Sequence, residues 1–389
     1  MKRFLVCCFM LILLLPSGCM MQRQVTDNIF VLAMAVDYQD GHYRVYASIL
    51  NPERSGGQAE ENEPDMPAII NATGKSLSNA MYNMRKDFPR FINLSRNRVL
   101  VLGKSALREG LHDIIDFYMR SHETQLSARV YVYDGDIGEV LTNSMHNAVD
   151  PAMALYEMAA FGREAGLFIT PIALDIAMHL YDSTTALTIP IFERKAPDPE
   201  MHGQASENKP HGGEDQQNEE EGEMGVDPSD SLILSGAALL QDGRYAANLS
   251  PEVSIPMTQL LLSGHGRDVH TVPLGNNARA GVQTLRRKNR LSVSLDGNVP
   301  ILRVNVEVEG QLIDLQGNVD LMKISEQYGE AIKHEVLLVL HTLYIERGAD
   351  ALGFGRKLLR RGRRAEVDWR AAELDVWVEA RVTQSGQIQ

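Results

Sequence analysis

The sequence predicts an α+β protein with mixed α/β order, built as two to three small domains in each of which a sheet packs with helices. Strand-like apolar runs alternate with segments whose apolar residues recur every three or four positions, which indicates sheets covered by helices rather than an all-β fold. The chain has 389 residues, 44% hydrophobic and 23% charged, a composition typical of globular proteins. That length exceeds one ordinary core, so more than one domain is expected.

The N-terminal stretch MKRFLVCCFMLILLLPSGC has the pattern of an export signal. Lys2 and Arg3 precede an apolar run, Phe4 to Leu15, that is shorter than the roughly 20 residues a membrane-spanning helix needs. The ending SGC resembles the bacterial lipobox, although Pro16 stands where Leu is usual. The resemblance implies that residues 1–18 are a lipoprotein signal peptide and that Cys19 carries the lipid. An ordinary signal peptide with an incidental cysteine, or an uncleaved anchor, is the alternative.

Cysteines and charge are unevenly distributed. All three cysteines, Cys7, Cys8 and Cys19, lie in the N-terminal stretch, so the mature chain has no disulfide framework and no cysteine metal site. The net charge is -13, and residues 196–230 contribute -10 of it, from eleven acidic residues and one lysine. We expect this segment to be an acidic disordered linker, because it has almost no apolar residues to bury. Divalent-cation binding by its glutamates is the sharper alternative. A basic nucleic-acid footprint is absent.

The predicted first domain, residues 19–195, begins with a hairpin. Apolar runs at Asn28 to Val36 and His42 to Leu50 flank Asp40-Gly41, a strong hairpin signal. Further strands are expected at 68–72, 98–102, 129–133 and 187–192, and helices at 76–88, 106–119, 151–162 and 171–182.

After the linker, the sequence predicts a small β-rich middle domain, residues 231–297, and a C-terminal α/β domain, residues 298–389. The strands are expected at 232–240, 269–272, 291–295, 301–308 and 375–382. A long helix from Leu321 to Ile345 has apolar residues every three or four positions, and Arg347-Gly348 supplies the cation and glycine favoured at a helix C-terminus.

The sequence contains no catalytic or nucleotide-binding motif with the required residue spacing. Two Gly-Lys-Ser triplets suggest a phosphate loop, but Ile69 and Arg98 occupy the positions where that loop requires glycine. The sequence has no nucleophile elbow, no zinc-protease pair and no spaced His/Cys set. His112 and Asp116 share a helix face, as many surface pairs do. We therefore predict no catalytic residue, no metal and no cofactor.

A basic run near the C-terminus is the candidate partner-binding surface. It follows the turn Gly353-Phe354-Gly355 and contains leucines among its cations. The candidate residues are Phe354, Arg356, Arg360, Arg361, Arg363 and Arg364. Contact with anionic lipid headgroups would use the same cations. A solvated face of a short helix is the alternative.

Several motifs appear in the order typical of one family. They are Gly74-Lys75-Ser76-Leu77, Phe88-Pro89-Arg90, the stretch Leu94 to Arg120, Asp350, Gly353-Phe354-Gly355, Trp369 and Trp377. With the lipobox, they resemble the Ger(x)C family of spore germination lipoproteins. Two segments depart from the family pattern, Met20 to Gln24 and Pro251 to Gly264.

The resemblance implies a non-enzymatic C subunit of a nutrient germinant receptor, required for assembly or signalling. It would be tethered by Cys19 to the outer face of the inner spore membrane, beside integral-membrane A- and B-type subunits. One alternative is a solute-binding lipoprotein that delivers a small nutrient to a transporter, which requires a ligand cleft with convergent polar groups. A second, a secreted hydrolase, needs a nucleophile and base that the sequence does not offer.

Overall fold

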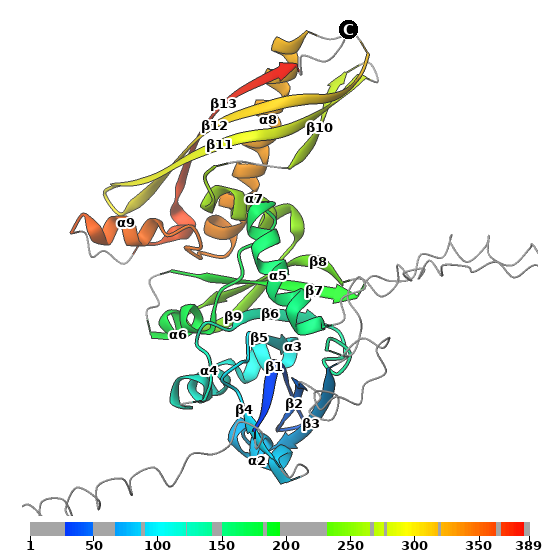
Figure 1. Cartoon of the computed structure of the whole chain (residues 1–389). Coiled ribbons are helices and arrows are strands. Elements are labelled where there is room, and N and C mark those ends of the chain that lie inside the picture. Colours follow the sequence, from blue (N-terminus) through cyan, green and yellow to red (C-terminus); the bar gives the residue numbers. More distant parts are fainter. Residues whose placement is uncertain are drawn as a thin grey trace, which may run out of the picture.

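The structure is a computed structural model in which two domains are stacked end to end (Figure 1). It describes residues 28–49, 67–86, 90–121, 123–141, 150–181, 185–194, 232–264, 268–275, 278–317, 320–362 and 367–384. The expected signal peptide, Cys19 and the acidic linker 196–230 lie outside these residues. No helix in the described part of the chain is long and apolar enough to span a membrane.

The first domain contains a mixed sheet in the order β3-β2-β1-β5-β6-β7-β8-β9, with β4 paired to β1. Its central strands β1, β5, β6 and β7 are parallel, and β2, β3, β8 and β9 are antiparallel to their neighbours. The strands are β1 (Asn28–Gln39), β2 (His42–Ile49), β3 (Ala68–Gly74), β4 (Phe91–Asn93), β5 (Val99–Gly103), β6 (Arg129–Asp134), β7 (Leu187–Arg194), β8 (Leu232–Gln241) and β9 (Arg244–Leu249). The predicted hairpin is confirmed, and Asp40 and Gly41 at its turn both have positive φ.

Helices cover both faces of this sheet. They are α2 (Leu77–Lys86), α3 (Lys104–Glu109), α4 (Leu111–Arg120), α5 (Pro151–Glu164) and α6 (Ala173–Tyr181). Alternate residues of each central strand serve the two sides, so Met34 packs with α2, α4 and α6 whereas Ala33 packs with α5. The helix expected at 106–119 is two helices, which meet at Gly110.

The second domain contains a four-stranded sheet, β10-β11-β12-β13, with one long helix on its inner face. Its elements are β10 (Val269–Gly275), β11 (Ala278–Asp296), β12 (Val299–Gln316), α8 (Leu321–Leu340), α9 (Phe354–Arg360) and β13 (Glu373–Gln384). The predicted long helix is confirmed and continues as a π-helical turn, His341–Glu346. Its apolar stripe, from Ile324 through Tyr328 and Ile332 to Leu340, is fully buried.

The prediction of a separate middle domain at 231–297 is wrong, because the strands of this segment belong to two different sheets. β8 and β9 pair onto β7 and complete the first sheet, whereas β10 and β11 belong to the second. The expected boundary at 298 cuts the hairpin of β11 and β12, which turns at Gly297 with Asp296 opposite Val299. The domain to which each strand belongs depends on which distant strand it pairs with. A local pattern of apolar residues carries no information about that pairing. A helix that the sequence did not predict, α7 (Pro251–Leu261), joins the two domains.

Candidate functional site at the junction of the two domains

α7 is the bridge between the domains, and its end is anchored on the second sheet. Residues on nearly all sides of the helix are buried, because it lies between the first sheet and α8. Asn289 on β11 closes its C-terminus: the amide Nδ2 donates to the carbonyls of Gln259 (2.7 Å), Leu260 (3.3 Å) and Leu262 (3.0 Å). These carbonyls would otherwise lack helical partners. The end of α7 is therefore held against β11 of the second domain.

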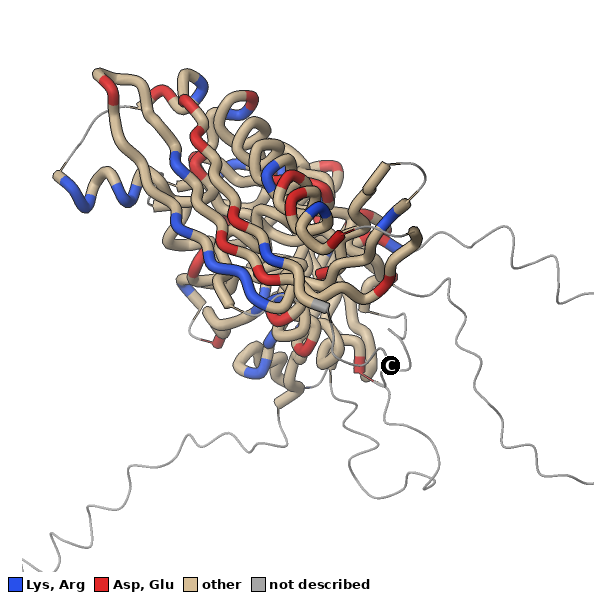
Figure 2. Tube along the Cα trace, turned by 90° about the horizontal axis from the view of Figure 1, so that it is seen from above, with Lys and Arg blue, Asp and Glu red and all other residues tan. Residues whose placement is uncertain are grey.

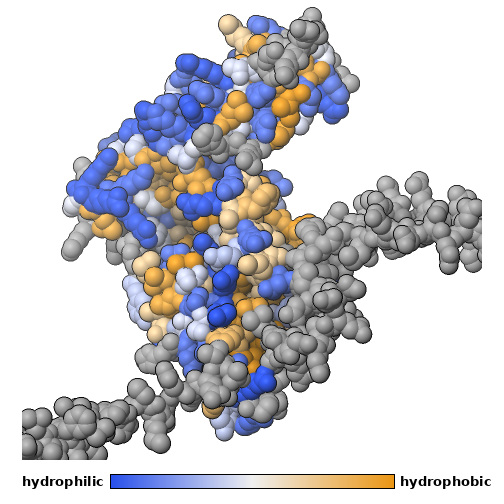
Figure 3. All heavy atoms as spheres, viewed as in Figure 1, coloured by the Kyte–Doolittle hydropathy of each residue, from blue (hydrophilic) through white to orange (hydrophobic). Residues whose placement is uncertain are grey.

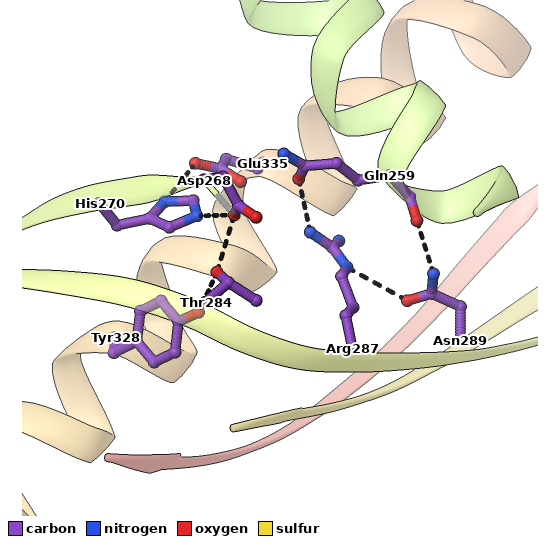
Figure 4. Close-up of polar contacts among 8 residues, drawn as sticks. All are labelled: Gln259, Asp268, His270, Thr284, Arg287, Asn289, Tyr328 and Glu335. Atoms are coloured by element: carbon purple, nitrogen blue, oxygen red, sulfur yellow. Dashed lines mark hydrogen bonds and ion pairs between the residues drawn. The ribbon is translucent and has the colours of Figure 1, made fainter. Parts of the chain in front are cut away.

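Arg287 lies beside this cap and is 4% exposed (Figure 4). Its guanidinium donates to Gln259 Oε1 (2.6 Å) on α7 and to Asn289 Oδ1 (3.2 Å). Burial lowers the pKa of Arg287, and the negative charges of Asp268 and Glu335 oppose that shift. A buried guanidinium is costly to desolvate, and these contacts offset part of that cost, while Nη2 has no hydrogen-bond partner among the described residues.

His270 on β10 stands between two carboxylates (Figure 4). Its ring nitrogens lie 2.6 Å from Asp268 Oδ2 and 3.2 Å from Glu335 Oε1. Burial alone would lower the pKa of His270, but the hydrogen bonds and charges of Asp268 and Glu335 raise it to about 9. Burial likewise opposes the charge on Asp268, yet the contact with His270 leaves the pKa of that carboxyl below its usual value. The imidazole is therefore a cation at neutral pH.

Hydroxyl groups connect this ion pair to the core. Thr284 on β11 donates to Asp268 Oδ2 (2.8 Å), and its Oγ1 lies 2.7 Å from the hydroxyl of Tyr328 on α8. Burial raises the pKa of Tyr328, so its hydroxyl stays protonated. These contacts link β10, β11 and α8 within the second domain, and the separate hydrogen bonds of Arg287 and Asn289 link β11 to α7.

A cleft of about 700 Å³ lies between this network and the end of α5 in the first domain. Its polar lining residues are Arg163, Glu164, Gln259, Ser263, Asp268 and Arg287. On the face shown in Figure 3 the surface is indented where the two domains meet. The charges of the network compensate one another, two cations against two carboxylates, and no described group of three or more His, Cys, Asp and Glu residues could hold a metal ion. The arrangement fixes one domain against the other and leaves a polar cleft beside the fixed joint.

The structure corrects one of the sequence-predicted binding residues. Phe354 is fully buried and packs edge-to-face against Tyr344, with ring centroids 5.5 Å apart. Asp350 accepts hydrogen bonds from the Tyr344 hydroxyl (2.6 Å) and from the backbone N–H groups of Phe354 (2.9 Å) and Gly355 (2.6 Å). Gly353 has φ +76°, which suits glycine. The Asp350 to Gly355 motif is therefore a folded turn that begins α9, and Phe354 is a core residue.

The predicted cations of the C-terminal basic run have different environments. Arg356 donates to the Thr185 hydroxyl of the first domain (3.1 Å), and Arg361 donates to the Val293 carbonyl on β11 (2.9 Å). Arg360 is exposed, and Figure 2 shows the basic helix at one side of the molecule. Arg363 and Arg364 lie outside the described residues. The expected partner surface is thus partly used by the fold itself.

Sequence reasoning missed the junction network. Its members are separated by up to 76 residues, from Gln259 to Glu335, so no short motif contains them. The one available signal was a second cluster of cations, Arg286, Arg287, Lys288 and Arg290, which lies in a strand where alternate residues are buried.

Comparisons with known proteins agree across both domains. Residues 21–194 match the model of the spore germination protein N-terminal domain, and residues 235–386 match the spore germination B3/GerAC-like C-terminal model. Over 373 residues the chain is 21% identical to YfkR of Bacillus subtilis (strain 168), a protein whose name assigns it to spore germination; the match covers 92% of this chain and 89% of YfkR.

A solved structure shares the fold. The crystal structure of the GerBC protein superposes with a TM-score of 0.52 at 12% identity, covering 90% of this chain and 96% of that one. The two family models lie in order and together match most of the sequence, one for each domain described above. This chain therefore belongs to the Ger(x)C, or GerAC-like, family of spore germination proteins.

Proposed function

We propose that the protein is a non-enzymatic, membrane-tethered lipoprotein subunit of a spore nutrient germinant receptor, required for receptor assembly or signalling. The observation that carries the proposal is the match of both family models, in order. The N-terminal stretch that precedes them ends in the lipobox-like SGC at Cys19. In this proposal the partners are integral-membrane A- and B-type subunits, and the protein lies on the outer face of the inner spore membrane.

The tether is tested at Cys19. A single acyl chain binds a membrane only marginally, whereas a diacylglyceryl anchor supplies two chains. Cys19→Ala should release the protein from spore membranes or leave the signal peptide uncut, and Cys7→Ala, in the same stretch, should do neither. Fractionation and the mass of the mature chain measure both effects. A correctly cut, membrane-bound Cys19→Ala protein would refute the tether.

The receptor role is tested by recovery of the complex. Tagged protein extracted from spore membranes should bring the A- and B-type subunits with it, and spores without the gene should respond poorly to nutrients. Recovery of the protein alone, together with a normal nutrient response of the deletion spores, would contradict the proposal.

The C-terminal basic run, which begins in α9, is the proposed partner contact. Arg360 is exposed and makes no described hydrogen bond or ion pair, so Arg360→Glu together with Arg363→Glu and Arg364→Glu should leave stability nearly unchanged and impair germination. Arg361→Glu is the contrasting variant, because it removes the bond to the Val293 carbonyl and should lower stability. Normal receptor assembly and nutrient response in the triple variant would remove this surface from the proposal.

The cleft at the domain junction favours a second candidate, a solute-binding lipoprotein. Its volume of about 700 Å³ is within the range of ligand sites, and Arg163, Glu164 and Asp268 offer charges of both signs. Titration calorimetry of the purified protein with amino acids and sugars tests this candidate. Binding that Glu164→Gln weakens would support it, and no binding would remove it.

A further inference from the structure

The second sheet protects one of its edges and leaves the other open. β10 is short and carries Pro273 and a register shift between Pro273 and Gly275. The remainder of β11 beyond β10 is covered: Arg287 exchanges two backbone hydrogen bonds with Gly264, and Lys357 donates to the Leu291 carbonyl (2.7 Å). Proteins shield edge strands in these ways because unpaired backbone groups would otherwise recruit further strands.

β13, at the opposite edge, has no proline, no register shift and no described backbone segment paired along its outer side, and one side chain, Ser325, bonds to its outer backbone. Its twelve residues, ELDVWVEARVTQ, contain no proline, glycine or lysine, and it pairs with β12 without a register shift. Val382 donates its backbone N–H to Ser325 on α8 (3.0 Å), which shows that its N–H points away from β12. Alternate residues of a strand point the same way. The backbone groups of Val376, Val378 and Ala380 therefore also face outward, and no described residue hydrogen-bonds to them.

A groove runs along this open edge between β13 and α8, with a volume of about 500 Å³. Gly329 brings the helix close to the strand: a Cβ there would lie 3.3 Å from the Cβ of Ala380. Val376, Val378 and Ala380 line the groove on the strand side, and Glu326, Glu330 and the single cation Lys333 are the charged residues on the helix side. An added strand would place one row of side chains in this groove.

The other row would lie over the outer face of the sheet, beside charged residues (Figure 2). On β13 this face presents Glu373, Asp375, Glu379 and Arg381 around Trp377, which is 51% exposed. Asp375 pairs with Arg303 (3.1 Å) and Glu379 with Arg381 (2.8 Å), but acids still outnumber cations on this face of β13 and in the groove. A second copy of this chain would bring the same acids together, whereas lysine or arginine would pair with them and stack on the indole.

We propose that the edge of β13 accepts a strand from a partner protein, an extended segment that alternates apolar with Lys or Arg side chains. Its backbone would pair with Val376, Val378 and Ala380, its apolar side chains would enter the groove, and its cations would lie beside Asp375, Trp377 and Glu379. This is strand addition, in which the main chain supplies affinity and alternate side chains supply specificity. The proposal depends on the second domain alone and not on the receptor role.

The test uses full-length protein purified in detergent and two ten-residue peptides, one of alternating Lys and Val and one of alternating Glu and Val. Binding is followed by tryptophan fluorescence and by hydrogen exchange of the β13 amides. The Lys-Val peptide should bind at least tenfold more tightly than the Glu-Val peptide and should slow exchange at Val376, Val378 and Ala380. Equal binding of the two peptides, no binding, or unchanged exchange would overturn the proposal.

Three variants make the test specific. Ala380→Pro removes an outward N–H, which an edge strand tolerates, and should weaken Lys-Val binding at least tenfold. Asp375→Lys with Glu379→Lys reverses the charge beside which the peptide's cations would lie, should also weaken binding, and covers the case in which the proline variant does not fold. Glu157→Lys, at an exposed position of α5, is the control and should leave binding of the Lys-Val peptide unchanged. Self-association of the wild-type chain that Ala380→Pro abolishes would identify a second copy as the occupant and overturn the proposal.

Discussion

His270 shows how one buried residue makes stability depend on pH. The contacts with Asp268 and Glu335 raise its pKa from 6.5 to about 9, so the folded protein binds this proton more tightly than the unfolded chain does. Its contribution is fully present below about pH 6.5 and is lost as the pH rises through about 9. The pKa of Asp268 shifts the other way, so its contribution is present above its ordinary value and is lost as the pH falls.

We predict that the thermal midpoint of the second domain falls as the pH rises from 6.5 to 9. A shift of this size corresponds to a loss of no more than about 3 kcal/mol. His270→Gln should remove most of the slope, whereas His334→Gln, at an exposed position on α8, should preserve it. Calorimetric scans at several pH values measure this, and parallel slopes for wild type and His270→Gln would contradict it.

Phe354 tests whether its motif serves the fold or a partner. It is fully buried against Tyr344, so Phe354→Ala should lower the free energy of unfolding by about 3 to 5 kcal/mol. Arg360→Ala, a few residues along the same helix, should cost less than about 0.5 kcal/mol because its side chain is exposed. Urea unfolding compares them. If the Phe354→Ala protein were as stable as wild type, Phe354 would not be a core residue and would again be a candidate for partner binding.

At the scale of the element, α8 is the helix that holds the second domain together. Leu340 is fully buried, whereas Leu338, on the opposite side of the helix, is 37% exposed. Leu340→Asp would bury an unpaired carboxylate and should unfold the domain, a cost of more than about 4 kcal/mol. Leu338→Asp, with the same change in chemistry, should be much milder. Loss of hydrogen-exchange protection in β12 reports the outcome, and equal effects of the two variants would contradict it.

Elements with a local signal could be predicted from the sequence, and elements defined by distant contacts could not. The Asp40-Gly41 hairpin and the stripe of α8 are local patterns, and both are confirmed. α7 escaped prediction because Pro256 lies inside it and residues on nearly all its sides are buried, which removes the helical period. β11 and β12 extend far beyond their apolar cores, because charged pairs such as Lys288 with Glu307 continue the pairing.

The candidate site was beyond sequence reasoning for a related reason. In the sequence Arg287 is one cation in the cluster Arg286 to Arg290, but it is buried and Lys288 beside it is exposed, because adjacent strand residues face opposite sides. Its partners come from α7, β10 and α8, so only the tertiary fold brings them together. Phe354 is the opposite case. The cations that follow it in the sequence suggested an exposed contact residue, but it is buried.

At the scale of the whole molecule, the first sheet explains how the chain accommodates the acidic segment. β7 ends at Arg194 and β8 begins at Leu232, and these residues are partners in the antiparallel register. Residues 195–231 therefore connect two neighbouring strands of one sheet. The domain needs only a hairpin turn at this point, whatever else the segment does.

We predict that replacing residues 195–231 with Asn-Gly leaves the fold intact. A two-residue turn of this type suits a hairpin, and closing a shorter loop costs less entropy, a gain of up to about 2.6 kcal/mol. The thermal midpoint should stay the same or rise by a few degrees. A Gly/Ser segment of the original length is the matched control and should behave as wild type, since it keeps loop length and removes the acidic sequence. A fall of more than a few degrees in the Asn-Gly variant alone would mean that the turn strains the β7–β8 register. A fall in both variants would mean that the acidic segment makes contacts on which the first sheet depends.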